Sequence, residues 1–499
     1  MRYIHKQLCL VVVIAGFIFP VTGFAQASSV IVGFHHQPGE AEQELIQRAG
    51  GTVKRIYHLI PAVVAVVPDQ AIAGLLDDPA VAYVEEDKTV VSIEPEYTHL
   101  ARDFFAADDA EYGNTWGVLR IGSQEAHERG ITGREVKLAI VDTGIDYYHE
   151  DLDENYRGGY DFVYDDNDPF DDSWNSHGTH IAGIIGAEAN GTGVVGVAPE
   201  VSLYALKALD GSGFGSLDSI IASIQWAVDN DMDVLNISIA GIESQVLEAA
   251  CNAAYEAGLL IVAAAGNTFG GEAAFPGAYT SVVAVASTDE ADQIGIFSPL
   301  APQVELAAPG LGIWSSALQG GYIEASGTSQ SAAHVSGAAA LVISSGAADV
   351  DSDGISRNHE VRQKLQTTAV DLGNAGRDEQ YGYGLVDVAA ATVTAPASTH
   401  IRLERKSRWY GNLETVALEG GQYQITIDND SLNAVIILVL ENHRMRKDLA
   451  ETVLFANPWG DAPQQASIEL DASAGALEVI MIPLGRVGAF ADVVVSVQE

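Results

Sequence analysis

The centre of this chain alternates short apolar segments with longer amphipathic ones, and this alternation restricts the fold more than any other feature. The apolar segments are rich in β-branched residues, as expected for strands covered on both faces of a parallel sheet. We therefore predict an α/β domain over residues 108–395, with three layers and a mostly parallel sheet. The predicted strands are Val136–Val141, Val201–Ala205, Val234–Ile239, Leu259–Ala264 and Val282–Ala286, and the predicted helices are Gly178–Ala187, Leu217–Asn230 and Gln245–Gly258.

Segments of a different character flank the central domain on both sides. Residues 28–96 follow the order β-α-β-β-α-β, which is the split βαβ or ferredoxin-like α+β arrangement. Residues 396–499 contain short β segments such as Tyr423–Ile427 and Val493–Val497, separated by Gly, Asn and Asp. This pattern predicts an all-β C-terminal domain of the sandwich type. It could bind a surface, assist folding or be removed.

Residues 1–27 have the three parts of a secretory signal peptide. Arg2 and Lys6 supply the basic region, and residues 9–21 form an apolar run that is short for a bilayer span. Ala25-Gln26-Ala27 is a cleavage site of small residues. The alternative is a membrane anchor, but no later run reaches spanning length without interruption. We therefore predict a secreted, extracellular protein with no stable membrane anchor.

The charge and cysteine content narrow the possible partners and stabilising elements. The chain has 499 residues, with 25 Lys and Arg against 68 Asp and Glu, which gives a formal net charge of −43. Nucleic acid is not an expected partner because its phosphates would be repelled. The only cysteines are Cys9 and Cys251, and Cys9 belongs to the signal peptide. The mature protein would therefore lack an intramolecular disulfide, and its fold would be stabilised by packing or by bound metal. We expect the protein to be a monomer.

Three short segments of the central domain supply the groups that amide hydrolysis requires. They contain Asp142, His177 and Ser329, in that order along the chain. In such a triad the serine attacks, the histidine accepts and returns the proton, and the aspartate fixes the imidazole tautomer. Each residue alone has an ordinary explanation, as a turn carboxylate, a surface histidine or a helix-capping serine. Their order, each within a longer motif, favours catalysis.

The central domain resembles the subtilisin-type peptidases. The resemblance rests on Val141-Asp142-Thr143-Gly144-Ile145, His177-Gly178-Thr179-His180, Gly327-Thr328-Ser329-Gln330-Ser331, Trp116-Gly117, Gly196-Val197-Ala198-Pro199, Ala308-Pro309-Gly310 and Tyr381-Gly382-Tyr383-Gly384. The order Asp, His, Ser is that of subtilisin and differs from that of chymotrypsin. The resemblance implies a serine endopeptidase that hydrolyses proteins or peptides through an acyl-enzyme and matures from a zymogen by self-cleavage.

The same resemblance extends to the segment before the central domain. Val81-Ala82-Tyr83-Val84-Glu85-Glu86-Asp87 is similar to the end of the family's inhibitor-type propeptide. Residues 28–96 would then be a propeptide that assists folding and acts as an intramolecular inhibitor. The alternative is an unrelated small domain, but its position between a signal peptide and a peptidase favours the propeptide.

The resemblance also implies residues that bind the substrate and the oxyanion. Asn267 matches the family's oxyanion asparagine, and the helix N-terminus behind Ser329 adds backbone donors. Ala274 falls near the base of the specificity pocket, where no acid aligns, so an apolar or aromatic residue is expected before the cut bond. Ala240 replaces a usual glycine, which predicts a tighter pocket mouth. The residues that match the two walls pairing with the substrate backbone are Ser212, Gly213, Phe214, Ser238, Ile239 and Ala240.

The sequence departs from the family pattern near the serine and the histidine. Gln330 stands where methionine is usual, which removes an oxidation-prone thioether beside the nucleophile. Ala333 stands where proline is usual and permits an unkinked helix. Two residues are inserted relative to the family within Ser173-Trp174-Asn175-Ser176. The insertion puts the course of the approach loop in doubt, but not the histidine.

Acidic motifs indicate that calcium (Ca²⁺) stabilises the protein. The segment Asp349–Glu360 fits the EF-hand spacing D-x-D-x-D-G-x5-E, with ligands from Asp349, Asp351, Asp353, Ile355 and Glu360. The family resemblance implies two further sites, one formed by Asp109, Asp151 and Asn190 and the other by Asp161, Asp166 and Asp168. The alternative for each is a solvated acidic turn.

Two other functions stay open on the sequence alone. A catalytically silent scaffold could leave the work to the C-terminal domain, although an intact triad with Asn267 argues against it. An acyl-transfer enzyme such as a peptide ligase would use the same site. Sequencing the fragments of a digested denatured protein would discriminate these functions.

Overall fold

The computed structural model describes residues 26–93, 96–101, 110–349 and 355–393, together with the strands between residues 399 and 498. Asp109, Asp351 and Asp353, and the predicted signal peptide up to residue 25, lie outside the described residues. Within the part of the chain that the structure describes, no helix has both the length and the apolar character needed to cross a bilayer.

A parallel sheet of seven strands forms the middle layer of the central domain. Its order is β15-β14-β13-β11-β7-β9-β8, and every neighbouring pair runs parallel. The predicted parallel α/β sheet is therefore confirmed. Its strands are β7 (Lys137–Asp142), β8 (Tyr156–Asp161), β9 (Ser202–Lys207), β11 (Val234–Ile237), β13 (Leu260–Ala264), β14 (Val282–Thr288) and β15 (Val304–Pro309).

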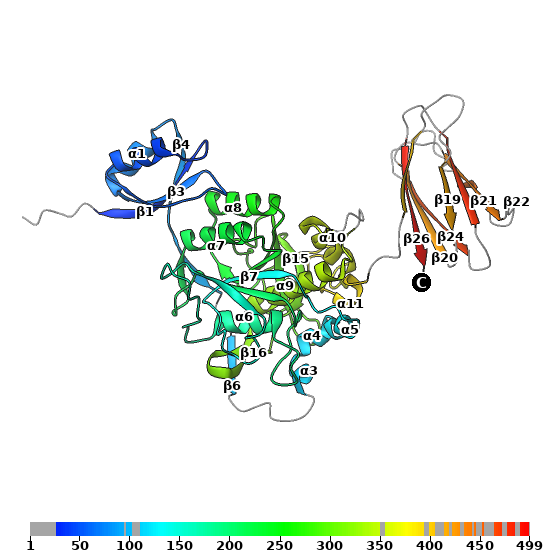
Figure 1. Ribbon diagram of the computed structural model, residues 1–499, viewed down its shortest axis with the longest axis horizontal. Helices are drawn as coiled ribbons and strands as arrows, with labels where there is room; N and C mark the ends of the chain where they lie inside the picture. The colour runs from blue at the N-terminus through cyan, green and yellow to red at the C-terminus, as the bar shows by residue number, and fades with distance from the viewer. Residues whose placement is uncertain are drawn as a thin grey trace, which may run out of the picture.

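Helices cover both faces of this sheet (Figure 1). Successive residues of β7 point to opposite faces, with Leu138 and Ile140 in one core and Ala139 and Val141 in the other. One core includes α6 (His177–Gly186), α9 (Thr328–Ser345) and α10 (Asn358–Thr368), and the other includes α7 (Leu217–Asp229) and α8 (Gln245–Glu256). Shorter helices are α3 (Ala110–Asn114), α4 (Trp116–Arg120), α5 (Ser123–Glu128), α11 (Val388–Ala391) and η2 (Leu318–Gly320).

An α+β unit precedes the central domain and lies beside α7 and α8 (Figure 1). Its four strands form an antiparallel sheet in the order β2-β3-β1-β4, which is the split βαβ topology. Ile31, Tyr57 and Val64 on one face of this sheet belong to the same apolar core as α7 and α8. The elements are β1 (Ala27–Phe34), α1 (Glu40–Arg48), β2 (Thr52–Ile56), β3 (Ala62–Pro68), η1 (Asp69–Ala71), α2 (Ile72–Leu76) and β4 (Val81–Glu86).

Two short strands after this unit pair with the central domain, and the sequence does not predict them. Strand β5 (Thr89–Ser92) lies between β10 (Phe214–Ser216) and β12 (Ile239–Ala240), antiparallel to both. Strand β6 (Glu96–Ala101) pairs antiparallel with β17 (Gly321–Ser326), which in turn pairs with β16 (Ile313–Ala317). The segment predicted as one strand, Val234–Ile239, leaves the large sheet after Ile237, because its last residue, Ile239, belongs to β12.

The strands described after residue 399 form two antiparallel sheets. Their orders are β18-β26-β20-β24 and β19-β25-β21-β22, with β23 paired to β21. The strands are β18 (Thr399–Glu404), β19 (Glu414–Leu418), β20 (Gln422–Asn429), β21 (Ala434–Glu441), β22 (Arg444–Met445), β23 (Thr452–Val453), β24 (Gln464–Asp471), β25 (Leu477–Leu484) and β26 (Phe490–Gln498).

Candidate active site

Asp142 and His177 form a buried hydrogen-bonded pair. Asp142 ends β7 at the carboxyl edge of the sheet, and His177 opens α6. The imidazole Nδ1 lies 2.7 Å from the Asp142 Oδ1, and both side chains are fully buried. A carboxylate only accepts hydrogen bonds, so Nδ1 carries the proton and Nε2 is the basic nitrogen of the ring. This is the tautomer that a catalytic base requires.

Ser329 lies in the first turn of α9, which packs against α6. The two helices meet near their N-termini, because His180 Nδ1 and Gln330 Nε2 are 3.5 Å apart. His180 follows His177 by one turn, and Gln330 directly follows Ser329. The packing therefore brings the ends that carry His177 and Ser329 together. The backbone N–H of Ser329 belongs to a first turn, where helices leave donors without intrahelical partners.

The neighbouring histidine His180 cannot replace His177 as a base. Its Nε2 lies 3.1 Å from the carbonyl oxygens of Ile313 and Ile323, so this nitrogen carries the proton. Burial lowers the pKa of His180 to about 3, which keeps the ring neutral.

Helix α9 continues through Ala333 without interruption, as predicted.

Asn267 is oriented by the residue that precedes Ser329. Its Oδ1 accepts hydrogen bonds from the Thr328 N–H at 3.1 Å and from the Thr328 Oγ1 at 3.0 Å. The Thr328 Oγ1 also accepts a hydrogen bond from the Gly266 N–H at 3.1 Å. With the amide oxygen held against Thr328, the amide nitrogen forms the opposite branch of the side chain. It is this branch that an oxyanion donor must present.

An uncharged cavity of about 360 Å³ lies beside Asn267. Its described lining includes Ile93, Ala240, Ala274 and Phe297, and none of the described lining residues is charged. Ala240 and Ala274, which the sequence predicts for the mouth and base of the specificity pocket, both line this cavity. Ile93, which follows β5, is only 4% exposed.

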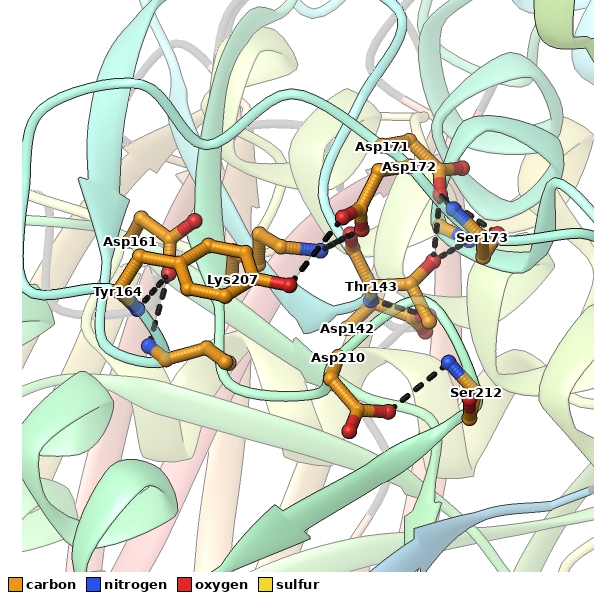
Figure 2. Close-up of polar contacts among 12 residues, drawn as sticks. Asp142, Thr143, Asp161, Tyr164, Asp171, Asp172, Ser173, Lys207, Asp210 and Ser212 are labelled. Atoms are coloured by element: carbon orange, nitrogen blue, oxygen red, sulfur yellow. Dashed lines mark hydrogen bonds and ion pairs between the residues drawn. The ribbon is translucent and has the colours of Figure 1, made fainter.

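The two predicted walls of the cleft lie on either side of β5. Val91 is opposite Phe214 on one side and Ala240 on the other, and Ile239 is opposite Ser92. The Ser92 N–H donates a hydrogen bond to the Gly213 carbonyl at 2.9 Å. The Ser212 N–H donates a hydrogen bond to the Asp210 carboxylate, which stabilises the adjacent turn (Figure 2). Ser238 Oγ lies 3.5 Å from the Ser329 carbonyl, so this wall also contacts the serine.

One pair of the predicted calcium ligands lies together. Asp151 Oδ1 and Asn190 Nδ2 are 3.2 Å apart, and Asp151 Oδ2 accepts hydrogen bonds from the Tyr322 hydroxyl and the Val194 N–H. Burial raises the pKa of Asp151. A nearby cation would offset the cost of burying this carboxylate.

Asp161, Asp166, Asp168 and Glu360 already accept hydrogen bonds from other protein groups. Asp161 accepts hydrogen bonds from the N–H groups of Val163 and Tyr164 (Figure 2), Asp166 from that of Asp168, and Asp168 from the Tyr147 hydroxyl. Glu360 accepts the Arg357 N–H and caps α10. Asp349 and Ile355 flank residues outside the described ranges. Among the residues that the structure describes, no three acidic, histidine or cysteine side chains are grouped to hold a metal ion.

Lys207 and Asp171 support the Asp142 segment, and neither was among the residues predicted from the sequence. The Lys207 Nζ, buried at the end of β9, donates hydrogen bonds of 2.6 Å to the Thr143 carbonyl and to Asp172 (Figure 2). Asp171 is completely buried beside Thr143. The sequence contains a signal for each of them: a lysine between the apolar residues Leu206 and Ala208, and two consecutive aspartates shortly before His177.

Comparisons with known proteins identify the family of the central domain. The model of the subtilase family matches residues 133–384. The minor extracellular protease Epr of Bacillus subtilis is 38% identical over 380 residues, which cover 75% of this chain but only 56% of that protein. Subtilisin E of the same species is 36% identical over 376 residues, or 74% of this chain and 89% of that protein. Subtilisin Savinase of Lederbergia lenta is 41% identical over 278 residues, which cover 56% of this chain and 98% of that protein. The chain belongs to the subtilase family and is a serine endopeptidase.

Proposed function

We propose that this chain is a secreted, calcium-stabilised endopeptidase that is made as a self-cleaving precursor. One observation carries the proposal. Strand β5 lies between the two walls of the cleft as a third strand, and the residue that follows it, Ile93, lines the uncharged cavity beside Asn267. An extended peptide held by backbone pairing, with a side chain in a pocket next to the reacting groups, has the form of a bound substrate.

In this proposal Asp142, His177 and Ser329 form the catalytic triad. The Ser329 Oγ attacks the peptide carbonyl while His177 Nε2 takes its proton. The Asn267 amide and the Ser329 N–H stabilise the oxyanion that develops. His177 then gives the proton to the leaving amine, which leaves an acyl-enzyme on Ser329. Water repeats the sequence and releases the acid, and Asp142 stabilises the imidazolium in both halves.

The self-cleavage bond in this proposal is Ile93–Glu94, so the propeptide ends at residue 93 instead of 96. Two carboxylates of the preceding unit would keep it attached after cleavage. Glu85 accepts hydrogen bonds from Gln245 N–H and the Ser244 hydroxyl at the start of α8. Asp87 accepts one from the Asp218 N–H at the start of α7. Carboxylates at helix N-termini are favourable because they complement the helix dipole. The cleaved propeptide is therefore expected to remain as an inhibitor.

Peptide cleavage should show a preference for large apolar residues before the cut bond. Ile93 lines this pocket, and none of its described lining residues is charged, so burial of an apolar side chain would provide the selectivity. We expect a peptide library, digested with the mature enzyme and read by mass spectrometry, to be enriched at that position in Leu, Ile, Phe, Tyr or Met. Enrichment in Lys or Arg would contradict the assigned pocket, and uncut peptides would favour a silent scaffold.

The Asp151 region fits a calcium site by its donor set. Calcium binds carboxylate, amide and carbonyl oxygens. Asp151 Oδ1 lies 3.2 Å from Asn190 Nδ2, so the Asn190 amide oxygen, which accepts hydrogen bonds from Thr192, would have to turn toward Asp151 for the loop that carries Asn190 to bind calcium with it. The predicted third member is Asp109. Bound calcium would supply positive charge that links this loop to the start of the mature chain. The carboxylates of the Asp161–Asp168 segment accept hydrogen bonds from protein groups, as those of Asp151 and Glu360 also do. The proposal places calcium at Asp151 and at the Asp349–Glu360 loop, with the Asp161–Asp168 segment as a third candidate.

Calcium should raise the melting temperature (Tm) of the mature enzyme. A ligand that binds only the native state at a hundredfold excess over Kd adds about 2.7 kcal/mol, which corresponds to about 5–10 °C for a domain of this size. We expect Asp151→Asn and Asp351→Asn each to reduce this increase in calorimetric scans against free calcium.

Magnesium at equal concentration is the control for that measurement. A chain with a net charge of −43 gains stability from any divalent ion by screening, and that part should appear with magnesium as well. Identical calcium and magnesium curves for wild type would contradict a specific site, and an unchanged Asp351→Asn curve would identify the EF-hand-like loop as an acidic turn.

A further inference from the structure

Asp171 lies where the segment carrying Asp142 meets the helix carrying His177. Its carboxylate is completely buried. Oδ1 accepts hydrogen bonds from the Thr143 hydroxyl at 3.0 Å and from the N–H and hydroxyl of Ser173 at 3.0 and 2.6 Å. Oδ2 accepts them from the N–H and hydroxyl of Thr179 at 3.1 and 2.6 Å. Figure 2 shows Asp171 next to Thr143 and Ser173, on the far side of Thr143 from Asp161.

The donors on Thr143 and Thr179 connect the two catalytic segments. Thr143 directly follows Asp142, and Thr179 is two residues after His177. The Thr143 hydroxyl also accepts a hydrogen bond of 3.0 Å from the Gly178 N–H. A continuous path therefore runs from the first turn of α6 through Thr143 to Asp171 and back to α6 through Thr179. It lies next to the 2.7 Å contact between Asp142 and His177, because Thr143 and Gly178 directly follow these two residues, but it includes neither of them.

A neutral side chain of the same shape could not satisfy this arrangement. Burial raises the pKa of Asp171, while the hydrogen bonds from Ser173 and Thr179 oppose that change. The donors on the Ser173 and Thr179 backbones are fixed, so an amide nitrogen in place of either oxygen would face N–H groups. A buried carboxylate is costly unless it is fully hydrogen-bonded, and here five donors from three residues meet it.

We propose that Asp171 is a positioning residue of the active site, which clamps Thr143 to the first turn of α6 and so fixes the alignment of Asp142 with His177. The inference rests on the triad proposed above. Displacement of a catalytic group by about 1 Å can cost about 100-fold in rate. The substrate walls β10 and β12 and the pocket residue Ala274 are not among the hydrogen-bond partners of Asp171. The effect should therefore fall on kcat and spare KM.

The test compares full-length precursors carrying Asp171→Asn, Thr143→Val, Thr143→Ser and the double change Asp171→Asn with Thr143→Val. Slow variants are matured with immobilised wild-type enzyme that is then removed. Asp233→Asn is the matched control. Asp233 is a partly buried aspartate that, like Asp171, accepts a backbone N–H, here from Lys137 at 2.8 Å, but it lies at the opposite end of β7. Rates are measured on a chromogenic peptide from low to high pH.

We expect Asp171→Asn and Thr143→Val each to lower kcat by about 10- to 100-fold with little change in KM. Thr143→Ser keeps the hydroxyl and should retain most activity, and Asp233→Asn should lower Tm but not kcat. The double variant should lose no more than the worse single one, since both act on one path. In Asp171→Asn the acid limb of kcat/KM should move to lower pH, because a misaligned Asp142 stabilises the imidazolium less.

The pH dependence of kcat/KM reflects the charged and titratable groups around His177. Asp142 faces His177 from β7, Asp171 lies beyond Thr143, Lys207 contacts the Thr143 carbonyl from β9, and His180 on α6 stays neutral. Wild-type kcat and pH profile in Asp171→Asn, or additive losses in the double variant, would overturn the inference. If Asp171→Asn does not fold, equal rates for Thr143→Ser and Thr143→Val would overturn it. Activity in a parallel Ser329→Ala preparation would instead overturn the triad itself, and this inference with it.

Discussion

Replacing Ser329 with alanine is expected to reduce peptide hydrolysis by about four to six orders of magnitude, since the members of a triad act as a unit. The same change should leave the precursor uncut at Ile93–Glu94, because the attacking oxygen is also the one that would cleave the chain's own bond. Wild-type protein should yield a new N-terminus at Glu94. Steady-state rates and N-terminal sequencing of the purified proteins measure the two effects separately.

A serine at the other end of the same helix provides the control. The Ser345 hydroxyl donates to the Val342 carbonyl within α9 and lies far along the helix from Ser329. Ser345→Ala should therefore mature and turn over like wild type. A purified Ser329→Ala precursor that still acquires Glu94 as its N-terminus, with no active enzyme added, would exclude self-cleavage by this serine.

The strands could be predicted, and the residues of the proposed triad could be singled out, because their signals are local. A buried parallel strand such as β13 is apolar along its whole length, and each triad residue lies inside a motif of its own. The support of the triad could not be predicted in the same way. Thr143 and Asp171 are 28 residues apart, and nothing in either segment specifies the other as its partner.

Two features of the cleft also could not be predicted from the local sequence. Thr89–Ser92 has too few residues to predict a strand, and its partners Phe214 and Ala240 follow it by more than a hundred residues. The segment Val234–Ile239 has uniform strand character, yet the chain leaves the large sheet after Ile237. The reason is tertiary, since Ile239 and Ala240 pair with β5 and Ser238 contacts Ser329.

Glu360 illustrates a motif with two structural explanations. Position twelve of an EF-hand loop requires a glutamate, and so does the third position of a capped helix. In the structure Glu360 accepts the Arg357 N–H as a helix cap. Sequence spacing cannot separate these roles, because both place a carboxylate in the first turn of a helix. The calcium titration described above can separate them.

Replacing Asn267 with alanine is expected to lower kcat by about 100- to 1,000-fold with little change in KM, which is the loss known for a subtilisin that lacks one oxyanion donor. The physical reason is that the amide nitrogen acts on charge that exists only in the transition state. Steady-state kinetics of matured protein, normalised to titrated active sites, provide the measurement.

Asn267→Asp separates this role from that of an ordinary turn residue. Aspartate keeps the acceptor for the Thr328 N–H and hydroxyl, and it suits turns as well as asparagine does. It replaces the donor with a negatively charged oxygen, which would repel the oxyanion. If Asn267 only shapes the turn, the aspartate variant should keep its kcat while alanine loses stability. If Asn267 stabilises the oxyanion, aspartate should be at least as inactive as alanine and the protein should remain folded.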